Sequence, residues 1–252
     1  MKASEKTNLK RVATIEARMT SSRLPGKIMK EIIGRPLLER LVERIRRASL
    51  VDEVIVATTV NPQDDVVEKW AGQAGISIYR GSEDDVLLRV LEAAKAFSGD
   101  IIVELTGDCP LLDPAMIDQV VRFYLDSDYD YVSNILERTY PRGFDIQVFS
   151  TAVLDEVNRL TQDPADHEHV SLYIYEHPER YKLGGLRAPD ALCAPDYRLC
   201  VDTPDDLEVI RKIYETLYPK NPAFSALDIL NFMRQHPDIA ELNSHVRQKP
   251  VR

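Results

Sequence analysis

The feature that most constrains the fold is an alternation of short apolar runs with amphipathic helical patterns. Val12–Ala17, Glu53–Thr58, Ile76–Tyr79 and Ile101–Leu105 are apolar runs of strand length. The segments between them repeat apolar residues at helical spacing, as in Leu37–Ile45. This order is typical of βαβ units and a mostly parallel sheet. We therefore expect an α/β fold with helices on both faces of the sheet.

The second half of the chain carries a different pattern. Tyr129–Asn134 and Phe144–Phe149 are strand-like, and an irregular segment with Pro141 and Gly143 separates them. We expect a small β excursion near residues 129–150. A further short strand is predicted at Arg198–Val201. No linker divides the chain, so residues 10–252 are predicted to form a single domain after a disordered tail over residues 1–9.

Composition excludes several classes of protein. The three cysteines have no metal-binding spacing, which fits a reducing compartment. No apolar run approaches the ~20 residues that cross a bilayer, so we expect a cytoplasmic protein without membrane contact. The net charge of −9 argues against nucleic-acid binding. Residues 10–47 are nevertheless basic, with a net charge of +7, which suggests a local anionic ligand such as a polyphosphate.

A basic loop follows the first predicted strand. Arg18, Arg23 and Lys27 are spaced five and four residues apart among Ser, Gly and Pro. Ligands of open α/β sheets bind at the carboxyl ends of the strands, where this loop begins. Arginine and lysine side chains there could bind phosphate oxygens. A plain basic surface loop has the same composition, and the spacing matches neither known glycine-rich phosphate motif.

Two aspartates also follow predicted strands. Asp108 comes after Ile101–Leu105, and Asp202 comes directly after Arg198–Val201. Strand ends of a parallel sheet meet at one edge, and paired carboxylates there could hold Mg²⁺ bound to phosphates. The alternative is structural: Asp108 could form a turn, and Asp202 could support the following helix, whose start resembles a capping box.

Together these segments resemble the cytidylyltransferase family that contains CMP-Kdo synthetases, CMP-sialic acid synthetases and spore coat polysaccharide biosynthesis protein F-like enzymes. The resemblance covers Val12 to about Tyr218 and is nearest to the spore coat branch. The nucleotide-loop motif is carried by Ala17, Arg18, Ser21, Arg23, Leu24, Pro25 and Lys27, the metal motif by Gly107, Asp108, Pro110 and Leu111, and a late motif by Val201 to Leu207.

The resemblance implies a Rossmann-like fold, similar to nucleotide-diphospho-sugar transferases, and transfer of CMP from CTP to a sugar-acid or related acceptor with release of pyrophosphate. It also implies a homodimer and Mg²⁺, held by Asp108 and Asp202. The implied catalytic residues are Arg18, Arg23, Lys27 and Asp108; the implied nucleotide-binding residues are Ala17, Arg18, Ser22, Arg23, Lys27, Gly81, Ser82, Asp85 and Gly107; and the implied acceptor-binding residues are Arg142, Glu168 and His169.

Two residues depart from the family pattern, and two other functions stay open. Glu16 stands where many relatives have Pro, and His167 stands where the spore coat branch commonly has Arg. Asp126, Asp128 and Asp130 match the DxD spacing of glycosyltransferases, but they follow a predicted helix instead of a strand. The remaining alternative is a module that binds a nucleotide without catalysis.

Overall fold

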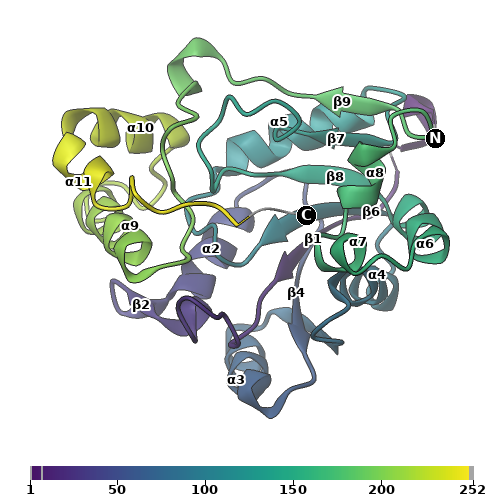
Figure 1. Cartoon of the computed structure of the whole chain (residues 1–252), viewed down its shortest axis with the longest axis horizontal. Coiled ribbons are helices and arrows are strands. Elements are labelled where there is room, and N and C mark those ends of the chain that lie inside the picture. Colours follow the sequence, from purple (N-terminus) through teal and green to yellow (C-terminus); the bar gives the residue numbers. More distant parts are fainter. Residues whose placement is uncertain (1, 7, 250–252) are drawn as a thin grey trace.

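The computed structural model describes residues 2–6 and 8–249, and its core is one seven-stranded sheet between two layers of helices (Figure 1). The strands are β1 (Arg11–Glu16), β2 (Glu31–Ile32), β3 (Arg35–Pro36), β4 (Glu53–Thr59), β5 (Ser77–Gly81), β6 (Ile101–Thr106), β7 (Tyr131–Ser133), β8 (Gln147–Ser150) and β9 (Leu183–Gly185). The helices are α1 (Ala3–Lys6), α2 (Leu37–Ile45), α3 (Asp65–Ala74), α4 (Val86–Ala96), α5 (Pro114–Leu125), α6 (Thr151–Leu160), α7 (Pro164–Glu168), α8 (Leu172–Glu176), α9 (Pro204–Leu217), α10 (Ala226–Gln235) and α11 (Pro237–Glu241).

The strand order of the main sheet is β5-β4-β1-β6-β8-β7-β9. Neighbouring strands are parallel from β5 to β6, and β7 pairs with β9 in parallel. Only β8 runs against its neighbours, β6 and β7. The sheet is mostly parallel, as predicted. The β excursion expected near residues 129–150 is present, but its two strands extend the main sheet instead of forming a separate one.

Both faces of the sheet are covered. Successive side chains of a strand point to opposite faces, so Ala13 and Val103 pack with α2 and α5, whereas Val12 and Ile102 pack with α4 and α6. This arrangement explains why apolar residues occur on both faces of the central strands. The predicted helices over both faces are confirmed, and the layers hold the carboxyl ends of β1, β4, β5 and β6 at one edge.

Sequence signals for helix starts are confirmed where a side chain caps the helix. Asp113 accepts a hydrogen bond from the Ala115 amide (2.8 Å) at the start of α5. Thr203 and Asp206 form the predicted capping box of α9. Because capping depends on residues close in sequence, it could be predicted without tertiary structure.

The predicted strand at Arg198–Val201 is wrong. This segment makes only an isolated parallel bridge between Arg142 and Arg198. Its neighbour contains Pro141, which has no amide hydrogen, and Gly143, whose φ is +101°. A ladder therefore cannot extend along it. Asp202 follows an irregular segment and not a strand of the sheet.

The predicted disordered tail over residues 1–9 is also wrong for the part of it that the structure describes; residues 1 and 7 lie outside that part. Ala3–Lys6 form a helical turn, and Lys6 is buried. Its ammonium donates to the carbonyls of Tyr124 (3.0 Å), Ser127 (3.0 Å) and Tyr129 (2.8 Å). Three carbonyl acceptors satisfy the buried cation and fix the segment against the end of α5.

Among the described residues, no helix has both the length and the apolar character needed to span a lipid bilayer.

Candidate active site

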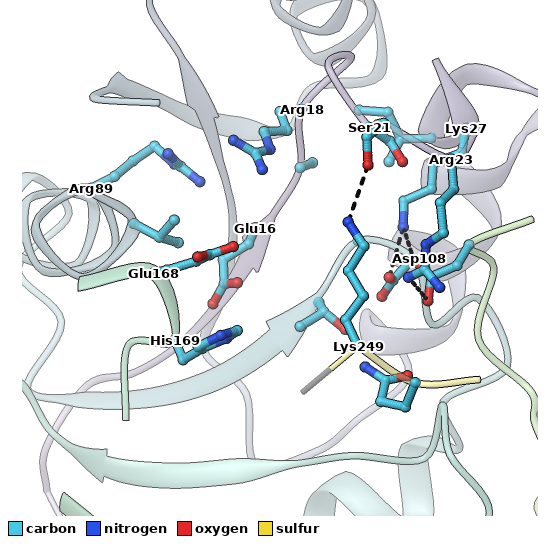
Figure 2. Close-up of a pocket in the computed structure, with 18 residues that line it drawn as sticks. Glu16, Arg18, Ser21, Arg23, Lys27, Arg89, Asp108, Glu168, His169 and Lys249 are labelled. Carbon is cyan, nitrogen blue, oxygen red and sulfur yellow. Dashed lines mark hydrogen bonds and ion pairs between the residues drawn. The ribbon is translucent and has the colours of Figure 1, made fainter. Parts of the chain in front are cut away.

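A cavity of about 530 Å³ opens at the edge of the sheet where β1 and β6 end. This volume is within the usual range for small-molecule sites. Figure 2 shows its lining side chains in two groups, with Lys27, Arg23 and Asp108 at one end and Glu16, Arg89, Glu168 and His169 at the other. Of the residues predicted from sequence, the cavity is lined by Ala17, Arg18, Ser21, Ser22, Arg23, Lys27, Gly107, Asp108, Glu168, His169 and Asp202.

The basic loop after β1 folds back on itself. The Met19 amide donates to the Asp64 carboxylate (2.7 Å), and the Gly26 amide donates to the Met19 carbonyl (2.9 Å). Gly26 has a φ of +68°, a conformation that glycine adopts without strain. This turn brings Lys27 back to the cavity that Arg18 lines from the start of the loop.

Gly107 allows β1 and the metal-motif segment to lie in close contact. Its amide donates to the Glu16 carbonyl (2.9 Å), and a Cβ at this position would lie 2.6 Å from the same oxygen. Any side chain would push the two segments apart. Glycine at position 107 therefore sets the spacing between the basic loop and Asp108.

The first end of the cavity is a network of charge pairs around Lys27. The Lys27 ammonium lies 2.8 Å from a carboxylate oxygen of Asp108 and 2.9 Å from one of Asp202. The second oxygen of Asp202 lies 2.8 Å from the Arg23 guanidinium. The two aspartates and two of the three loop cations, distant in sequence, therefore share one site. We call Arg23, Lys27, Asp108 and Asp202 the paired end.

A second layer of polar contacts holds Asp202. Arg198 donates to Asp202 and also to Asp206 (3.0 Å). The buried Asp206 carboxylate accepts the amides of Asp202 (2.9 Å) and Thr203 (2.9 Å) as well. The capping box of α9 thus fixes the backbone of Asp202. It positions this residue in place of the strand predicted from the sequence.

The charges at the paired end stabilise one another. Burial alone would lower the pKa of Lys27, but the charges of Asp108 and Asp202 outweigh it and raise that pKa. Burial alone would raise the pKa of Asp108, but Lys27 outweighs it and holds the pKa below its usual value. Lys27 is thus a cation and Asp108 an anion at neutral pH.

The opposite end of the cavity holds buried polar atoms without partners. Among the described residues, no hydrogen bond reaches Glu16 Oε1, Glu104 Oε2 or Arg89 Nε. Burial raises the pKa of Glu16 to about 7, although Arg89 opposes this, and burial beside Glu16 raises the pKa of Glu104 as well. The Glu16 and Glu104 carboxyl groups lie close enough to share a proton in a hydrogen bond, and the Arg89 Nε is a buried donor beside the cavity that a ligand could satisfy. We call Glu16, Arg89, Glu168 and His169 the open end; Glu104 lies behind Glu16 and does not line the cavity.

A strained turn presents His169 to this end. Val170, the next residue, is buried and has a φ of +46°. A β-branched residue in this conformation is unfavourable, at about 1–3 kcal/mol, and such strain is most frequent at functional sites.

Three predicted nucleotide-binding residues lie outside the cavity lining. Asp85 caps α4 by accepting the Leu88 amide (2.8 Å) and also pairs with His167 (2.8 Å). Ser82 accepts the Asp85 amide (3.1 Å), and Gly81 packs against Arg89. Gly81, Ser82 and Asp85 therefore make contacts that support the start of α4 and do not themselves line the cavity. His167, the departure from the family pattern, belongs to this support.

Arg142 does not join Glu168 and His169. It lines a separate hollow of about 260 Å³ together with Arg198, Arg247 and Gln248. Gln248 lines both hollows and lies between them. The structure therefore does not bring together the three residues predicted to bind the acceptor.

The DxD aspartates lie away from the cavity. Asp128 accepts the Ala3 amide (2.9 Å), and Asp130 accepts the Lys182 amide (3.0 Å). None of the three aspartates lines the cavity. Their contacts support the N-terminal turn and the start of β9, which disfavours the glycosyltransferase alternative.

Several cavity residues were not predicted from the sequence, among them Arg89, Gln248 and Lys249. Arg89 is almost fully buried in α4. Gln248 and Lys249 reach the cavity from the C-terminal segment. No motif marks any of them, because only the tertiary fold brings these segments to the cavity.

Comparison with known proteins identifies the family. The sequence model described as "Cytidylyltransferase" matches residues 12–226. The chain is 34% identical to the spore coat polysaccharide biosynthesis protein SpsF of Bacillus subtilis (strain 168), over 90% of this chain and 95% of that protein. It is 31% identical to the 3-deoxy-manno-octulosonate cytidylyltransferase of Geobacter metallireducens, over 66% of this chain and 75% of that one.

A solved structure gives the same result. A cytidylyltransferase from Leptospira borgpetersenii serovar Hardjo-bovis (strain JB197) superimposes with a TM-score of 0.88 and 32% sequence identity, over 96% of this chain and 100% of that chain. The resemblance and the fold inferred from sequence are confirmed.

Proposed function

This chain belongs to the cytidylyltransferase family, a family of nucleotidyltransferases, and we propose that it transfers CMP from CTP to a sugar acid or a related acceptor. The observation that carries the proposal is the paired end, where loop cations and two distant aspartates surround one cavity. The names of the relatives point to activated sugars for surface polysaccharides.

In the proposed reaction, an acceptor oxygen attacks the α-phosphorus of CTP and pyrophosphate leaves. Arg18, Arg23 and Lys27 bind the triphosphate and neutralise the charge that develops on the leaving pyrophosphate. Asp202 contacts Arg23 and Lys27, and Glu83 lies 3.4 Å from Arg18, so all three cations have contacts that position them before the ligand binds. Positioning and charge stabilisation are the main sources of rate in phosphoryl-type transfers.

The paired end also fits a divalent cation. Asp108 and Asp202 already converge on one positive charge, the Lys27 ammonium. Among the described residues, no group of three or more His, Cys, Asp or Glu side chains could hold a metal. Mg²⁺ typically takes one or two carboxylates and completes its ligands with phosphates and water. Asp108 and Asp202 would hold it, and bound Mg²⁺ would neutralise phosphate charge.

The open end is our choice for the acceptor side, with Glu168 and His169 as its contacts. Neither side chain makes a hydrogen bond or ion pair within the described chain, and both line the cavity. A polyhydroxylated acceptor would supply hydroxyl donors for the carboxyl group of Glu16, which lines the same end of the cavity. Arg142 has no assigned part in this proposal.

The test is a pyrophosphate-release screen that crosses four nucleoside triphosphates with panels of sugar acids and sugar phosphates. We expect release only with CTP, and most strongly with a sugar acid. Release with UTP or GTP but not CTP would contradict the nucleotide assignment. Saturable CTP binding without pyrophosphate from any acceptor would support a non-catalytic module.

Two further expectations rest on sequence alone. The cytoplasmic location stays a prediction. We also propose a homodimer, from the family resemblance; light scattering should then give twice the 28.7 kDa of one chain.

A further inference from the structure

The C-terminal segment 243–249, here called the strap, runs from α11 back toward the carboxyl edge of the sheet (Figure 1). It lies outside residues 12–226, which match the family. Two of its side chains, Gln248 and Lys249, line the cavity.

The strap is anchored at both ends of its described length. The buried Asn243 side chain donates to the Arg198 carbonyl (3.0 Å) and to the Asp206 carboxylate (2.8 Å). Near the other end, Gln248 accepts a hydrogen bond from Arg198 (2.8 Å). Arg198 is the residue that also holds Asp202. The position of the strap is therefore tied to the paired end.

Lys249 extends from the strap toward the basic loop (Figure 2). Its ammonium donates to the Ser22 hydroxyl (3.3 Å), and the adjoining Arg247 carbonyl accepts from Arg23 (3.5 Å). An ammonium has three donors, and no carboxylate of the described chain pairs with Lys249. Lys27, in contrast, contacts two carboxylates. Lys249 thus adds an uncompensated cation beside Arg23 and Ser22.

We propose that Lys249 binds the β- or γ-phosphate of the nucleotide triphosphate, so that the strap covers the phosphate side of the bound CTP. The inference rests on the proposed function. Arg23 and Lys27 are already paired with Asp108 and Asp202, so Lys249 adds positive charge beyond what these carboxylates balance, and a polyphosphate would balance it. Arg18, Arg23 and Lys27 then act together with Lys249 on the phosphates.

The experiment is calorimetric titration of the full chain with CTP and with CMP, both in the presence of Mg²⁺. Lys249→Ala should weaken CTP binding about tenfold, as expected for one charge-assisted contact. CMP lacks the β- and γ-phosphates, so its Kd should stay within about twofold. Lys249→Arg should restore most of the CTP affinity, because it keeps the charge.

Lys69→Ala is the matched control, since Lys69 is exposed on α3 and its loss changes the net charge equally. Unchanged CTP affinity in Lys249→Ala would overturn the inference while the proposed function stands. Equal weakening of CTP and CMP would also overturn it, because that result indicates a general change of the site. A wild-type chain that binds no CTP would overturn both proposals.

Discussion

The two ends of the cavity differ in how their polar groups are satisfied. At the paired end, Lys27 joins Asp108 and Asp202, and Arg23 and Arg198 complete the contacts of Asp202. At the open end, Glu16 and Arg89 each have a buried atom that makes no hydrogen bond within the part of the chain that the structure describes. A site can therefore be organised in two ways: the paired end is rigid before any ligand arrives, whereas the open end depends on the ligand to satisfy it.

The largest expected effect tests the paired end directly. Asp108→Ala should reduce pyrophosphate release by about 10³-fold, because Asp108 is the proposed metal ligand and its loss would remove several kcal/mol of charge stabilisation, each 1.36 kcal/mol being about tenfold in rate. Circular dichroism should show the same fold.

Asp128→Ala is the control for that experiment, since Asp128 lies outside the cavity and belongs to the DxD pattern. Its turnover should remain near that of the wild type. If Asp128→Ala loses activity and Asp108→Ala retains it, the glycosyltransferase alternative is favoured. That result would contradict the roles proposed for the paired end and the open end.

The next largest effect is on stability, and it tests the charge network at the paired end independently of catalysis. Lys27→Met leaves Asp108 and Asp202 facing each other without their shared cation. We expect the free energy of unfolding to fall by about 2 kcal/mol and Tm by about 4–8 °C in EDTA. Millimolar Mg²⁺ should raise Tm more in the variant than in the wild type, because the ion replaces the lost charge.

Thermal unfolding with and without Mg²⁺ measures this, with Lys69→Met as the control for charge loss. If Mg²⁺ shifts Tm equally in both proteins, the two aspartates do not form a cation site.

A smaller effect sharpens the description of the open end. Glu16 has a pKa raised to about 7 from its ordinary value of 4.5, so the folded state binds a proton more tightly than the unfolded state. Stability from this group is present below pH 4.5 and is lost as pH rises toward 7. Glu16→Gln, always neutral, should therefore gain about 1–2 kcal/mol relative to the wild type between pH 5 and pH 8.

Urea unfolding at pH 5 and at pH 8 measures the difference in the free energy of unfolding between Glu16→Gln and the wild type. Glu215→Gln, at an exposed position on α9, should show no such change. A constant difference between Glu16→Gln and the wild type would mean that Glu16 is already charged in the folded state.

The smallest effect compares two helix caps. Thr203→Ala and Ser225→Ala each remove the capping hydroxyl of a capping box, at α9 and α10, and each should lower the free energy of unfolding by about 1 kcal/mol. Only Thr203→Ala should also reduce pyrophosphate release, by a few-fold, because the α9 box holds the backbone of Asp202. Equal turnover in the two variants would show that the cap does not position Asp202.

The sequence predicted the paired end better than the open end, for a physical reason. Lys27 and Asp108 stand in short motifs at strand ends, and strand order brings such ends together. Asp202 also converges there, but through a capping box and an isolated bridge in place of the expected strand. Gly81, Ser82 and Asp85 lie outside the cavity lining and make local contacts, so their nucleotide-binding role stays a prediction.

The open end depends on contacts between distant segments. Arg89 comes from a helix whose pattern fits a surface position equally well, and Glu104 lies inside a strand that reads as apolar. Lys249, beside the paired end, was missed for a similar reason, because its segment has no periodic pattern. Burial at these positions depends on which helices cover the sheet, and that information is not local to any motif.

The backbone contact between Val201 and Asp108 has a wider consequence. The Val201 amide donates to the Asp108 carbonyl at 2.8 Å, so the two segments that carry the aspartates are joined directly. The part of the intervening chain that contains α6, α7 and β9 makes neither this contact nor the Arg142–Arg198 bridge beside it. Insertions or exchanges in that stretch could alter which acceptor is taken while the phosphate chemistry keeps its geometry. Grafting that stretch from a relative is therefore a route to new acceptors on an unchanged catalytic frame.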